Sequence, residues 1–364
     1  MLKNEIDFIL ELCKYIKPNE TIINELINNG LDYPYILGQL LFNRVGGAAY
    51  YTLNKINLLG KMNREFRNTL KIIYETNRIK NESFKKALDY LSEIFTDTDI
   101  PYALLKGSYL VNIYPTGLRT SNDIDILINF KDSSGISGLL LNNGFVQGNI
   151  RNGELVKATR AEIISSQINR GEAVPFIKEI NLPYMRFLEI DINFSLDFKP
   201  EQDKSIISEM LKKSTCVIKT ENGDLYTLSK QDFLIQLCAH LYKEASVYSW
   251  VEFGRDQGLY KYLDIYLFIS EFSEIIFTDL FEERIKNFGV EKECYYALKE
   301  TKELFDTENN IALNAFLEKI KPNDISYLKE IYDPATRKKY KYEIPFKEWV
   351  FCGKRREYLN EVDS

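Results

Sequence analysis

LLKGSYLVNIYPTGLRTSNDIDILINF, residues 104–130, is the stretch that decides the fold of this 364-residue chain. It begins apolar, stops at Lys-Gly-Ser and passes a polar segment. It then places Asp123 and Asp125 at the head of a run that otherwise reads as a buried strand. Burying a carboxylate without a partner costs on the order of several kcal/mol. The surroundings of these two acids must therefore supply compensating charge, and the source of that charge is a guide to function.

The spacing of the two aspartates predicts a shared binding face. Because side chains alternate along a strand, Asp123 and Asp125 project to one face, while Ile124, Ile126 and Ile128 project to the other, into a core. Two carboxylates this close repel each other, and a divalent cation between them is the simplest remedy. Oxygen ligands favour Mg²⁺, with Mn²⁺ as the alternative, held together with substrate phosphates.

The Lys106-Gly107-Ser108 turn separates a predicted short strand from a predicted helical turn. Gly107 allows the backbone to approach a ligand closely, and the helix N-terminus and the Ser108 hydroxyl would face an anion. Ser108 is also suited to a purely structural role as a helix cap. A phosphate-binding turn and a metal pair, one loop apart, predict a site for a nucleoside triphosphate (NTP).

This arrangement resembles a known superfamily. Gly-Ser followed by an Asp-x-Asp strand is similar to the nucleotidyltransferases typified by DNA polymerase β, although Asn122 stands at a place that is hydrophobic in that pattern. The full string also resembles the bacterial uncharacterised nucleotidyltransferases, which share Leu-Lys-Gly, a short helix, Tyr-Pro, Arg and the Asp-x-Asp strand. The resemblance is close over about residues 104–145 and looser over a later acidic strand and the helices after 228. The spacing from Gly107 to Asp123 is longer than in compact members, and YPTGLR makes up the difference.

The resemblance implies a third carboxylate from a later strand. The segment FLEIDINF (187–194) supplies Asp191 as the first candidate and Glu189, on the same face, as the second. By position, Asp123 and Asp125 would hold Mg²⁺ on the triphosphate. Asp191 would complete a second metal site and act as base on the acceptor hydroxyl.

Five further residues are predicted to contact the nucleotide: Lys106, Gly107, Ser108, Arg119 and His240. The resemblance implies that Gly107 and Ser108 hold the β- and γ-phosphates. Lys106 and Arg119 either neutralise phosphate charge or form salt bridges with neighbouring carboxylates. His240 borders the apolar stripe of a predicted helix, where a packed or hydrogen-bonded histidine is the plainer expectation and a contact with nucleotide or acceptor is the functional one.

Composition narrows the partners and the compartment. The net charge of −6 gives no global basic footprint for nucleic acid, although the tail 337–356 mixes basic and aromatic residues and suits either an anion-binding surface or a solvated flank. Five scattered cysteines without a C-x-x-C pair indicate reduced thiols, and a single histidine argues against a zinc site. The first residues are unlike a signal peptide and no apolar run is long enough to span a membrane, so we expect a cytoplasmic protein without a membrane partner.

These signals predict an α+β fold, with a small mixed β-sheet of the polymerase-β type between helical regions. We expect a helical N-terminal region over 1–97, a nucleotidyltransferase core over 98–227 and a helical C-terminal region with the basic aromatic tail over 228–364. A strictly alternating strand is predicted over 185–198. The stretch 147–172 reads as a polar segment with one helix.

The predicted function is Mg²⁺-dependent transfer of a nucleoside monophosphate from an NTP, such as ATP, to a hydroxyl or phosphate of an acceptor, with release of pyrophosphate. The acidic net charge favours a small molecule, peptide or protein as acceptor over nucleic acid. Two alternatives stay open: a catalytically silent nucleotide-binding or scaffolding protein on the same fold, and a toxin-like nucleotidyltransferase acting on tRNA.

Overall fold

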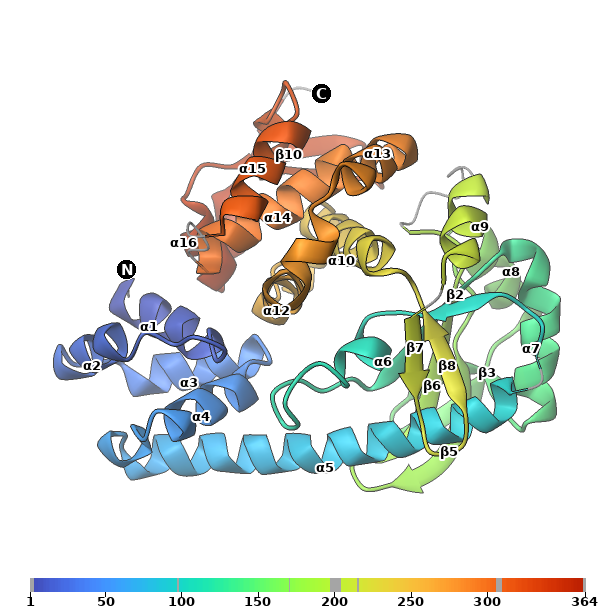
Figure 1. Cartoon of the computed structure of the whole chain (residues 1–364), viewed down its shortest axis with the longest axis horizontal. Coiled ribbons are helices and arrows are strands. Elements are labelled where there is room, and N and C mark those ends of the chain that lie inside the picture. The colour runs from blue at the N-terminus through green and yellow to red at the C-terminus, as the bar shows by residue number, and fades with distance from the viewer. Residues whose placement is uncertain are drawn as a thin grey trace. The chain divides into compact units, whose positions relative to one another are not determined.

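A mixed β-sheet in the middle of the chain carries the candidate acids (Figure 1). The computed structural model describes residues 3–96, 98–169, 171–196, 204–214, 216–305 and 310–362. They divide into a unit over Thr76–Gln236, which contains the sheet, and a unit that joins Met1–Glu75 to Leu237–Ser364. The α+β class with a mixed sheet and flanking helices is confirmed.

The sheet has eight strands in the order β4-β3-β5-β6-β2-β1-β8-β7. The strands are β1 (Tyr102–Leu104), β2 (Asp123–Ile128), β3 (Val146–Arg151), β4 (Glu154–Lys157), β5 (Phe176–Leu182), β6 (Met185–Asn193), β7 (Cys216–Lys219) and β8 (Asp224–Thr227). β2 pairs with β6 in parallel and β1 with β8 in parallel, whereas the other neighbours are antiparallel. The sheet extends beyond the strands read from the sequence, because two hairpins are added at its edges.

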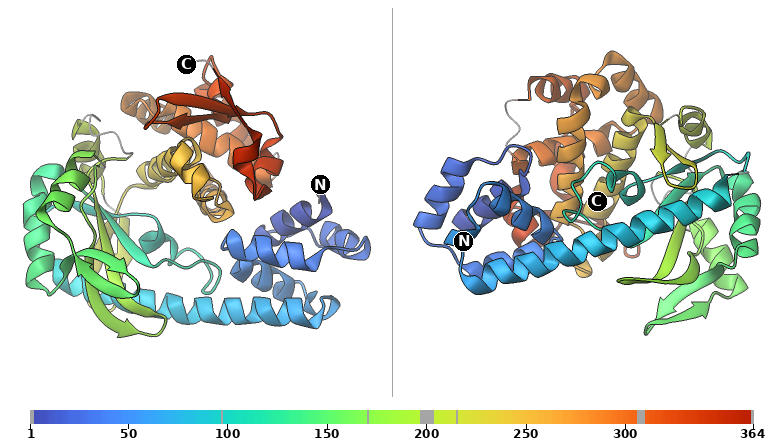
Figure 2. Two further views of the ribbon diagram at one scale, coloured as in Figure 1. Left: turned by 180° about the vertical axis from the view of Figure 1, so that it is seen from behind. Right: turned by 60° about the horizontal axis from the view of Figure 1, so that its bottom comes forward.

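Helices complete this unit. They are the second half of α5 (Arg64–Phe95), α6 (Gly107–Leu110), the 3₁₀ turn η2 (Phe130–Asp132), α7 (Ser133–Asn142), α8 (Arg160–Asn169), α9 (Lys204–Lys212) and the start of α10 (Lys230–Ala245). The C-terminal half of α5 runs beside the strands (Figure 2). It is tied to their loops, because Ser83 Oγ donates to the carbonyl of Pro183 (2.8 Å) and the Glu221 amide donates to Asp89 (2.9 Å).

β6 alternates as the sequence predicts. Its fully buried side chains are Leu188, Ile190 and Ile192. Its acidic face carries Glu189 and Asp191, which are only partly buried. The strand ends at Asn193, and positions 197–198 of the predicted strand lie outside the described residues.

The stretch 147–172 holds a hairpin that was not predicted. β3 and β4 pair in antiparallel fashion and are joined at Asn152-Gly153, both with positive φ (53° and 79°). Asn-Gly is the preferred sequence of a two-residue turn with these angles. The signal was present in the sequence, and the polar character of the flanking strand residues obscured it. The helix α8 follows where the polar segment was expected to contain one.

The second unit is mainly helical. Its helices are α1 (Lys3–Cys13), α2 (Glu20–Asn28), α3 (Tyr33–Phe42), α4 (Gly46–Lys55), the start of α5, the end of α10, α11 (Tyr248–Glu252), α12 (Leu259–Ile276), α13 (Asp279–Phe288), α14 (Glu291–Phe305), α15 (Ile311–Ile320) and α16 (Phe346–Phe351), with 3₁₀ turns η1 (Leu59–Lys61), η3 (Ser326–Lys329) and η4 (Arg355–Tyr358). A three-stranded antiparallel sheet adds β9 (Glu330–Asp333), β10 (Lys338–Tyr342) and β11 (Leu359–Val362).

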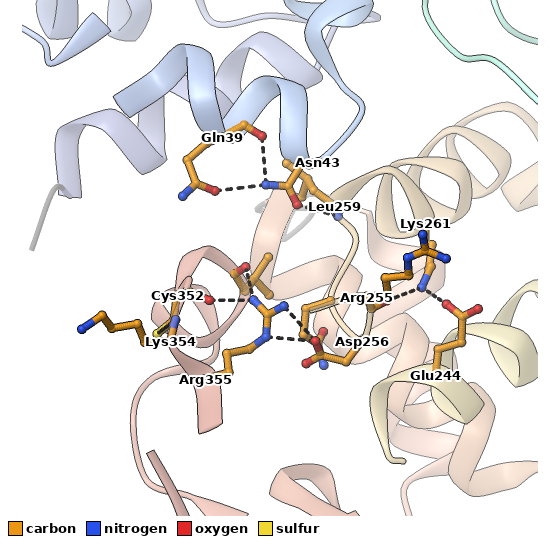
Figure 3. A network of polar contacts seen from close by, with 12 residues as sticks. Gln39, Asn43, Glu244, Arg255, Asp256, Leu259, Lys261, Cys352, Lys354 and Arg355 are labelled. Carbon is orange, nitrogen blue, oxygen red and sulfur yellow. Dashed lines mark hydrogen bonds and ion pairs between the residues drawn. The ribbon is translucent and has the colours of Figure 1, made fainter. Parts of the chain in front are cut away.

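Buried polar groups join distant segments within this unit (Figure 3). Asn43 at the end of α3 accepts a hydrogen bond from the amide of Leu259 (3.1 Å), the first residue of α12. Arg355 forms an ion pair with Asp256, with Nη2 to Oδ1 at 2.8 Å, and both side chains are almost fully buried. These contacts fix the N-terminal helices and the C-terminal tail to the same core.

The basic aromatic tail is folded and its charges are largely offset. Trp349 is fully buried and stacks on Tyr342, with ring centroids 4.1 Å apart. The ion pairs of the tail are Lys338 with Glu361, Lys341 with Glu330, Lys354 with Glu357, Arg355 with Asp256, and Arg356 with Glu252. This pairing favours the reading of the tail as a folded flank over a one-sided basic surface for nucleic acid.

The described residues include no helix with the length and apolarity needed to cross a membrane. All five cysteines are free thiols, and Cys13, Cys238 and Cys294 are buried. Burial raises the pKa of the Cys13 thiol far above its ordinary value, so this residue serves as a packing group and is not a reactive thiolate.

Glu300 on α14 gives the second unit a predicted pH dependence. Its side chain is 3% exposed, Oε1 contacts Lys299 Nζ at 2.8 Å, and burial raises the pKa of the carboxyl from 4.5 to about 7. Because the folded pKa exceeds the unfolded one, the folded state loses stability as pH rises from about 4.5 through 7. Glu300→Gln cannot ionise. We therefore expect the unfolding free energy of this variant, relative to the wild type, to rise by up to about 3 kcal/mol between pH 5 and pH 8.

Urea unfolding at several pH values measures this difference. Glu303→Gln is the matched control, since Glu303 contacts the same lysine (3.1 Å) from a more exposed position. A Glu300→Gln difference that stays constant with pH would contradict the predicted role of the buried carboxyl.

Candidate active site

The acid-bearing strands β2 and β6 are parallel neighbours, and their register brings four carboxylates together. Asp123 pairs with Glu189, and Asp125 pairs with Asp191. Paired residues of adjacent strands project to the same face of a sheet, so all four side chains share one face. Both candidates for the third carboxylate therefore lie beside the Asp-x-Asp pair. Asp191 lies opposite Asp125, and Glu189 lies opposite Asp123.

Burial makes this face electrostatically costly. Asp125 is 5% exposed, and burial raises the pKa of its carboxyl, while the Lys106 ammonium offsets part of that rise. Burial followed by repulsion from Asp125 and Asp123 raises the pKa of Asp191 well above its ordinary range. Burial and then Asp123 also raise the pKa of Glu189. Carboxylates in this state gain stability from any cation placed among them.

Lys106 is that cation in this structure. Its Nζ lies 2.7 Å from Asp125 Oδ1. Burial alone would lower the pKa of the Lys106 ammonium, but Asp125, with smaller effects of Asp123 and Asp191, holds it above its ordinary value. The sequence left open whether Lys106 contacts phosphate or a neighbouring carboxylate, and the contact present here is with the carboxylate.

Gly107 occupies a position without room for a side chain. A Cβ atom there would lie 2.6 Å from Ser121 Cβ and closer still to Ser121 Oγ. Ser121 Oγ in turn lies 3.3 Å from Asp123 Oδ1, so the glycine turn and the acidic strand are in direct contact through this serine. The adjacent Ser108 Oγ is fully buried and has no hydrogen-bond partner among the described residues. The hydroxyl therefore makes no cap hydrogen bond here, and a phosphate contact of Ser108 stays a prediction.

The extra YPTGLR loop is held by two asparagines of α5, which sequence reasoning missed. Asn77 Nδ2 donates to the carbonyl of Gly117 (3.1 Å). Asn81 accepts from the amide of Gly117 (2.7 Å) and donates to the carbonyl of Arg119 (2.7 Å). Asn77 and Asn81 are four residues apart and therefore lie on one face of the helix. The loop thus has a defined path to Asp123 despite its length.

Arg119 and His240 each contact a group of their own segment. The Arg119 guanidinium donates from Nη1 to the carbonyl of Thr120 (2.9 Å) and lies on the Gly107 side of the loop.

His240 belongs to the part of α10 in the second unit, and its Nε2 lies 3.5 Å from Glu244 Oε1, one turn further on. A nucleotide contact of His240 stays a prediction. A further residue missed from the sequence is Asn193, whose side-chain hydrogen bond lowers the pKa of Asp125.

The donor set consists of carboxylate oxygens, the ligands that a hard divalent cation prefers. Within the described ranges, no three His, Cys, Asp or Glu side chains are already arranged to hold a metal ion. Mg²⁺ is commonly bound by one or two carboxylates together with substrate phosphates, so a complete protein cage is not required. Asp123, Asp125 and Asp191 supply oxygens of this kind on one face, and no thiol or imidazole is among them.

A mixed sheet with paired acidic strands beside a tight Gly-Ser turn defines the nucleotidyltransferase class. The family model described as "Uncharacterised nucleotidyltransferase" matches residues 30–306, which is most of the chain. The chain belongs to this family and is a nucleotidyltransferase, as the motif resemblance predicts.

Comparison with individual proteins adds likenesses to solved structures. The chain is similar to a solved structure described as an antigenic nucleotidyltransferase-like protein from Paracoccidioides brasiliensis. The identity is 13% and the TM-score 0.40, over 66% of this chain and 94% of the other. No curated protein matches the sequence. Membership of the family therefore rests on the family model.

Proposed function

We propose that this enzyme moves a nucleoside monophosphate from an NTP to a hydroxyl or phosphate group of an acceptor, with Mg²⁺ as the metal and pyrophosphate as the second product. One observation supports the proposal most strongly. Asp125 lies in register with Asp191 on the neighbouring parallel strand, and Asp123 lies two residues earlier on the same face.

The proposed metal ligands are Asp123, Asp125 and Asp191, and Mn²⁺ is an alternative to Mg²⁺. When bound, such ions stabilise negative charge on the attacking and leaving oxygens of an in-line displacement. In the proposed reaction the acceptor oxygen bonds to the α-phosphorus. The bond from that phosphorus to the oxygen shared with the β-phosphate breaks, and pyrophosphate leaves. The proton of the acceptor hydroxyl passes to a carboxylate, for which we propose Asp191.

The Gly107 turn is the proposed binding site of the β- and γ-phosphates. The Arg119 guanidinium beside Gly107 and the unpartnered Ser108 hydroxyl support this role. Lys106 and Arg119 are the proposed counter-charges of the triphosphate. Positioning and charge stabilisation supply most of the rate enhancement in phosphoryl-type transfer, so these residues carry much of the proposed activity.

The acceptor that we favour is a small molecule or a peptide or protein side chain. The net charge of −6 and the internal pairing of the basic tail both weigh against a nucleic acid. ATP or another NTP is the donor. The free cysteines agree with the reducing conditions of the cytoplasm, which we propose as the compartment.

Thermal unfolding of the full chain with each NTP, with and without Mg²⁺, tests the site without any acceptor. At about 100 times its dissociation constant, a ligand adds about 2.7 kcal/mol of stability. We expect a Mg²⁺-dependent rise in the unfolding temperature for at least one NTP in the wild type. The rise should be lost in the variant Asp123→Asn, Asp125→Asn.

A matched control removes two exposed carboxylates from the same sheet unit, with Glu154→Gln and Glu179→Gln, both of which contact Arg186. This control should keep the full nucleotide shift. An equal shift in the Asp123→Asn, Asp125→Asn protein, or no Mg²⁺-dependent shift with any NTP, would overturn the proposed site.

A further inference from the structure

The position of Lys106 indicates a role in addition to phosphate binding. Its residue conformation is unusual: φ is +46° and ψ is −120°, in a region that side-chain-bearing residues rarely adopt. The chain is fixed on both sides of this residue. The Leu105 amide donates to the carbonyl of Asp125 (2.9 Å), and the Lys106 carbonyl accepts from the amide of Leu110 (3.0 Å). The fold therefore maintains a rarely adopted backbone conformation at the residue whose ammonium contacts Asp125.

Several carboxylates surround the Lys106 ammonium. Its ammonium interacts with Asp125 most strongly and with Asp123 and Asp191 as well, the same three carboxylates that are the proposed metal ligands. It therefore neutralises part of the charge that a divalent cation would otherwise neutralise. An ammonium and a divalent cation a few ångströms apart repel each other, so the two cannot share Asp125 favourably.

We propose that Lys106 is the resident counterion of the acidic site and that it exchanges with the divalent cation when the nucleotide arrives. This inference rests on the proposed function. The triphosphate, as a polyanion, accepts the Lys106 ammonium by charge-assisted hydrogen bonds. Asp125 is then released for the metal, so metal and nucleotide bind together while metal alone binds weakly. Lys106 is thus a positioning residue that couples the two ligands.

Mn²⁺ binding to the full chain tests the exchange directly. Free Mn²⁺ is measured by electron paramagnetic resonance, first with the metal alone and then with NTP present, against an NTP-only titration. In Lys106→Met we expect Mn²⁺ alone to bind at least about tenfold more tightly than in the wild type, because the competing charge is gone. The strengthening of Mn²⁺ binding by NTP, expected in the wild type, should be much smaller in this variant.

Two further variants sharpen the test. Lys106→Gln is a second neutral replacement that keeps a hydrogen-bond donor for Asp125, and it should also bind Mn²⁺ alone more tightly. Lys219→Met removes a solvent-exposed lysine of the same unit, whose partner is Asp224 (2.8 Å), and should leave Mn²⁺ binding unchanged.

The outcomes separate this inference from the function on which it rests. If Mn²⁺ binds the wild type and both neutral Lys106 variants equally, or binds those variants more weakly, the exchange is overturned while the metal site stands. If Mn²⁺ binds none of the proteins, with or without NTP, the metal site itself fails and the exchange fails with it.

Discussion

Asp191→Asn is expected to reduce nucleotidyl transfer about a thousandfold, which corresponds to about 4 kcal/mol of activation free energy. The reason lies in the register of β6 against β2. Asp191 is directly opposite Asp125 and interacts with Asp123 and Lys106 as well, so its charge is felt by most of the charged groups on this face. Asparagine keeps the shape of the side chain and removes both the negative charge and the proposed proton acceptor.

The measurement uses water as the acceptor, because NTP hydrolysis to the monophosphate and pyrophosphate needs no identified substrate. Conversion of α-labelled NTP is followed with Mg²⁺ for the wild type and the variants. Glu189→Gln is the comparison on the same strand. It removes a carboxylate opposite Asp123, and we expect less than a tenfold loss. A thousandfold loss in Glu189→Gln with near-normal Asp191→Asn would exchange the roles of the two residues.

The placement of Asp191 and Glu189 could be predicted only in part from the sequence. The alternation of side chains is local, so the sharing of one face by Asp123 and Asp125, and by Glu189 and Asp191, follows from the sequence. The pairing between the two strands does not. It depends on which strand lies beside β2, a choice made by long-range packing and loop closure. Only the structure shows that Asp191 and not Glu189 lies opposite Asp125.

The surroundings of the Gly107 turn were less predictable for a similar reason. The sequence allows Lys106 either a phosphate contact or a salt bridge with a neighbouring carboxylate, and only the folded sheet shows that Asp125 is its partner. Asn77 and Asn81 lie in the predicted helical N-terminal region, where they resemble ordinary solvated residues of a helix. Their partners are carbonyl and amide groups of a distant loop, which no sequence pattern identifies.

The tail of the second unit is a case in which composition leaves two readings open, an anion-binding surface and a solvated flank. Basic and aromatic residues interleaved in the tail are typical of a nucleic-acid surface. In the structure the aromatic Trp349 is core and Arg355 is buried against Asp256. Sequence alone does not distinguish a buried arginine from an exposed one. Arg355 and Arg356 are adjacent in the chain, yet only Arg355 is buried. The tail therefore contributes Trp349 and Arg355 to the interior of the unit, where one reading of the sequence expected an exposed binding surface.

Arg355→Met is accordingly expected to lower the free energy of unfolding by about 3–5 kcal/mol at pH 7. Arg355 Nε and Nη2 both contact Asp256 Oδ1 (3.0 and 2.8 Å), and Nη1 donates to the carbonyl of Cys352 (2.8 Å) (Figure 3). Methionine fills most of the volume but leaves the Asp256 carboxylate buried without its counter-charge. Burial already raises the pKa of Asp256 and Arg355 lowers it, so removal of the arginine raises it further. The loss of stability should therefore be smaller at pH 5 than at pH 7, since the carboxyl is then more easily protonated.

Urea unfolding of the full chain at both pH values measures these changes, and two variants isolate the cause. Arg355→Met combined with Asp256→Asn removes the unpaired charge and should recover a large part of the loss. Arg356→Met alters the next residue, which is about 60% exposed and lies 3.7 Å from Glu252, and should cost less than about 1 kcal/mol. Equal losses for Arg355→Met and Arg356→Met would show that the buried pair does not stabilise the unit. A loss in Arg355→Met that persists unchanged in the double variant would assign it to the carbonyl contacts of the guanidinium instead of the ion pair.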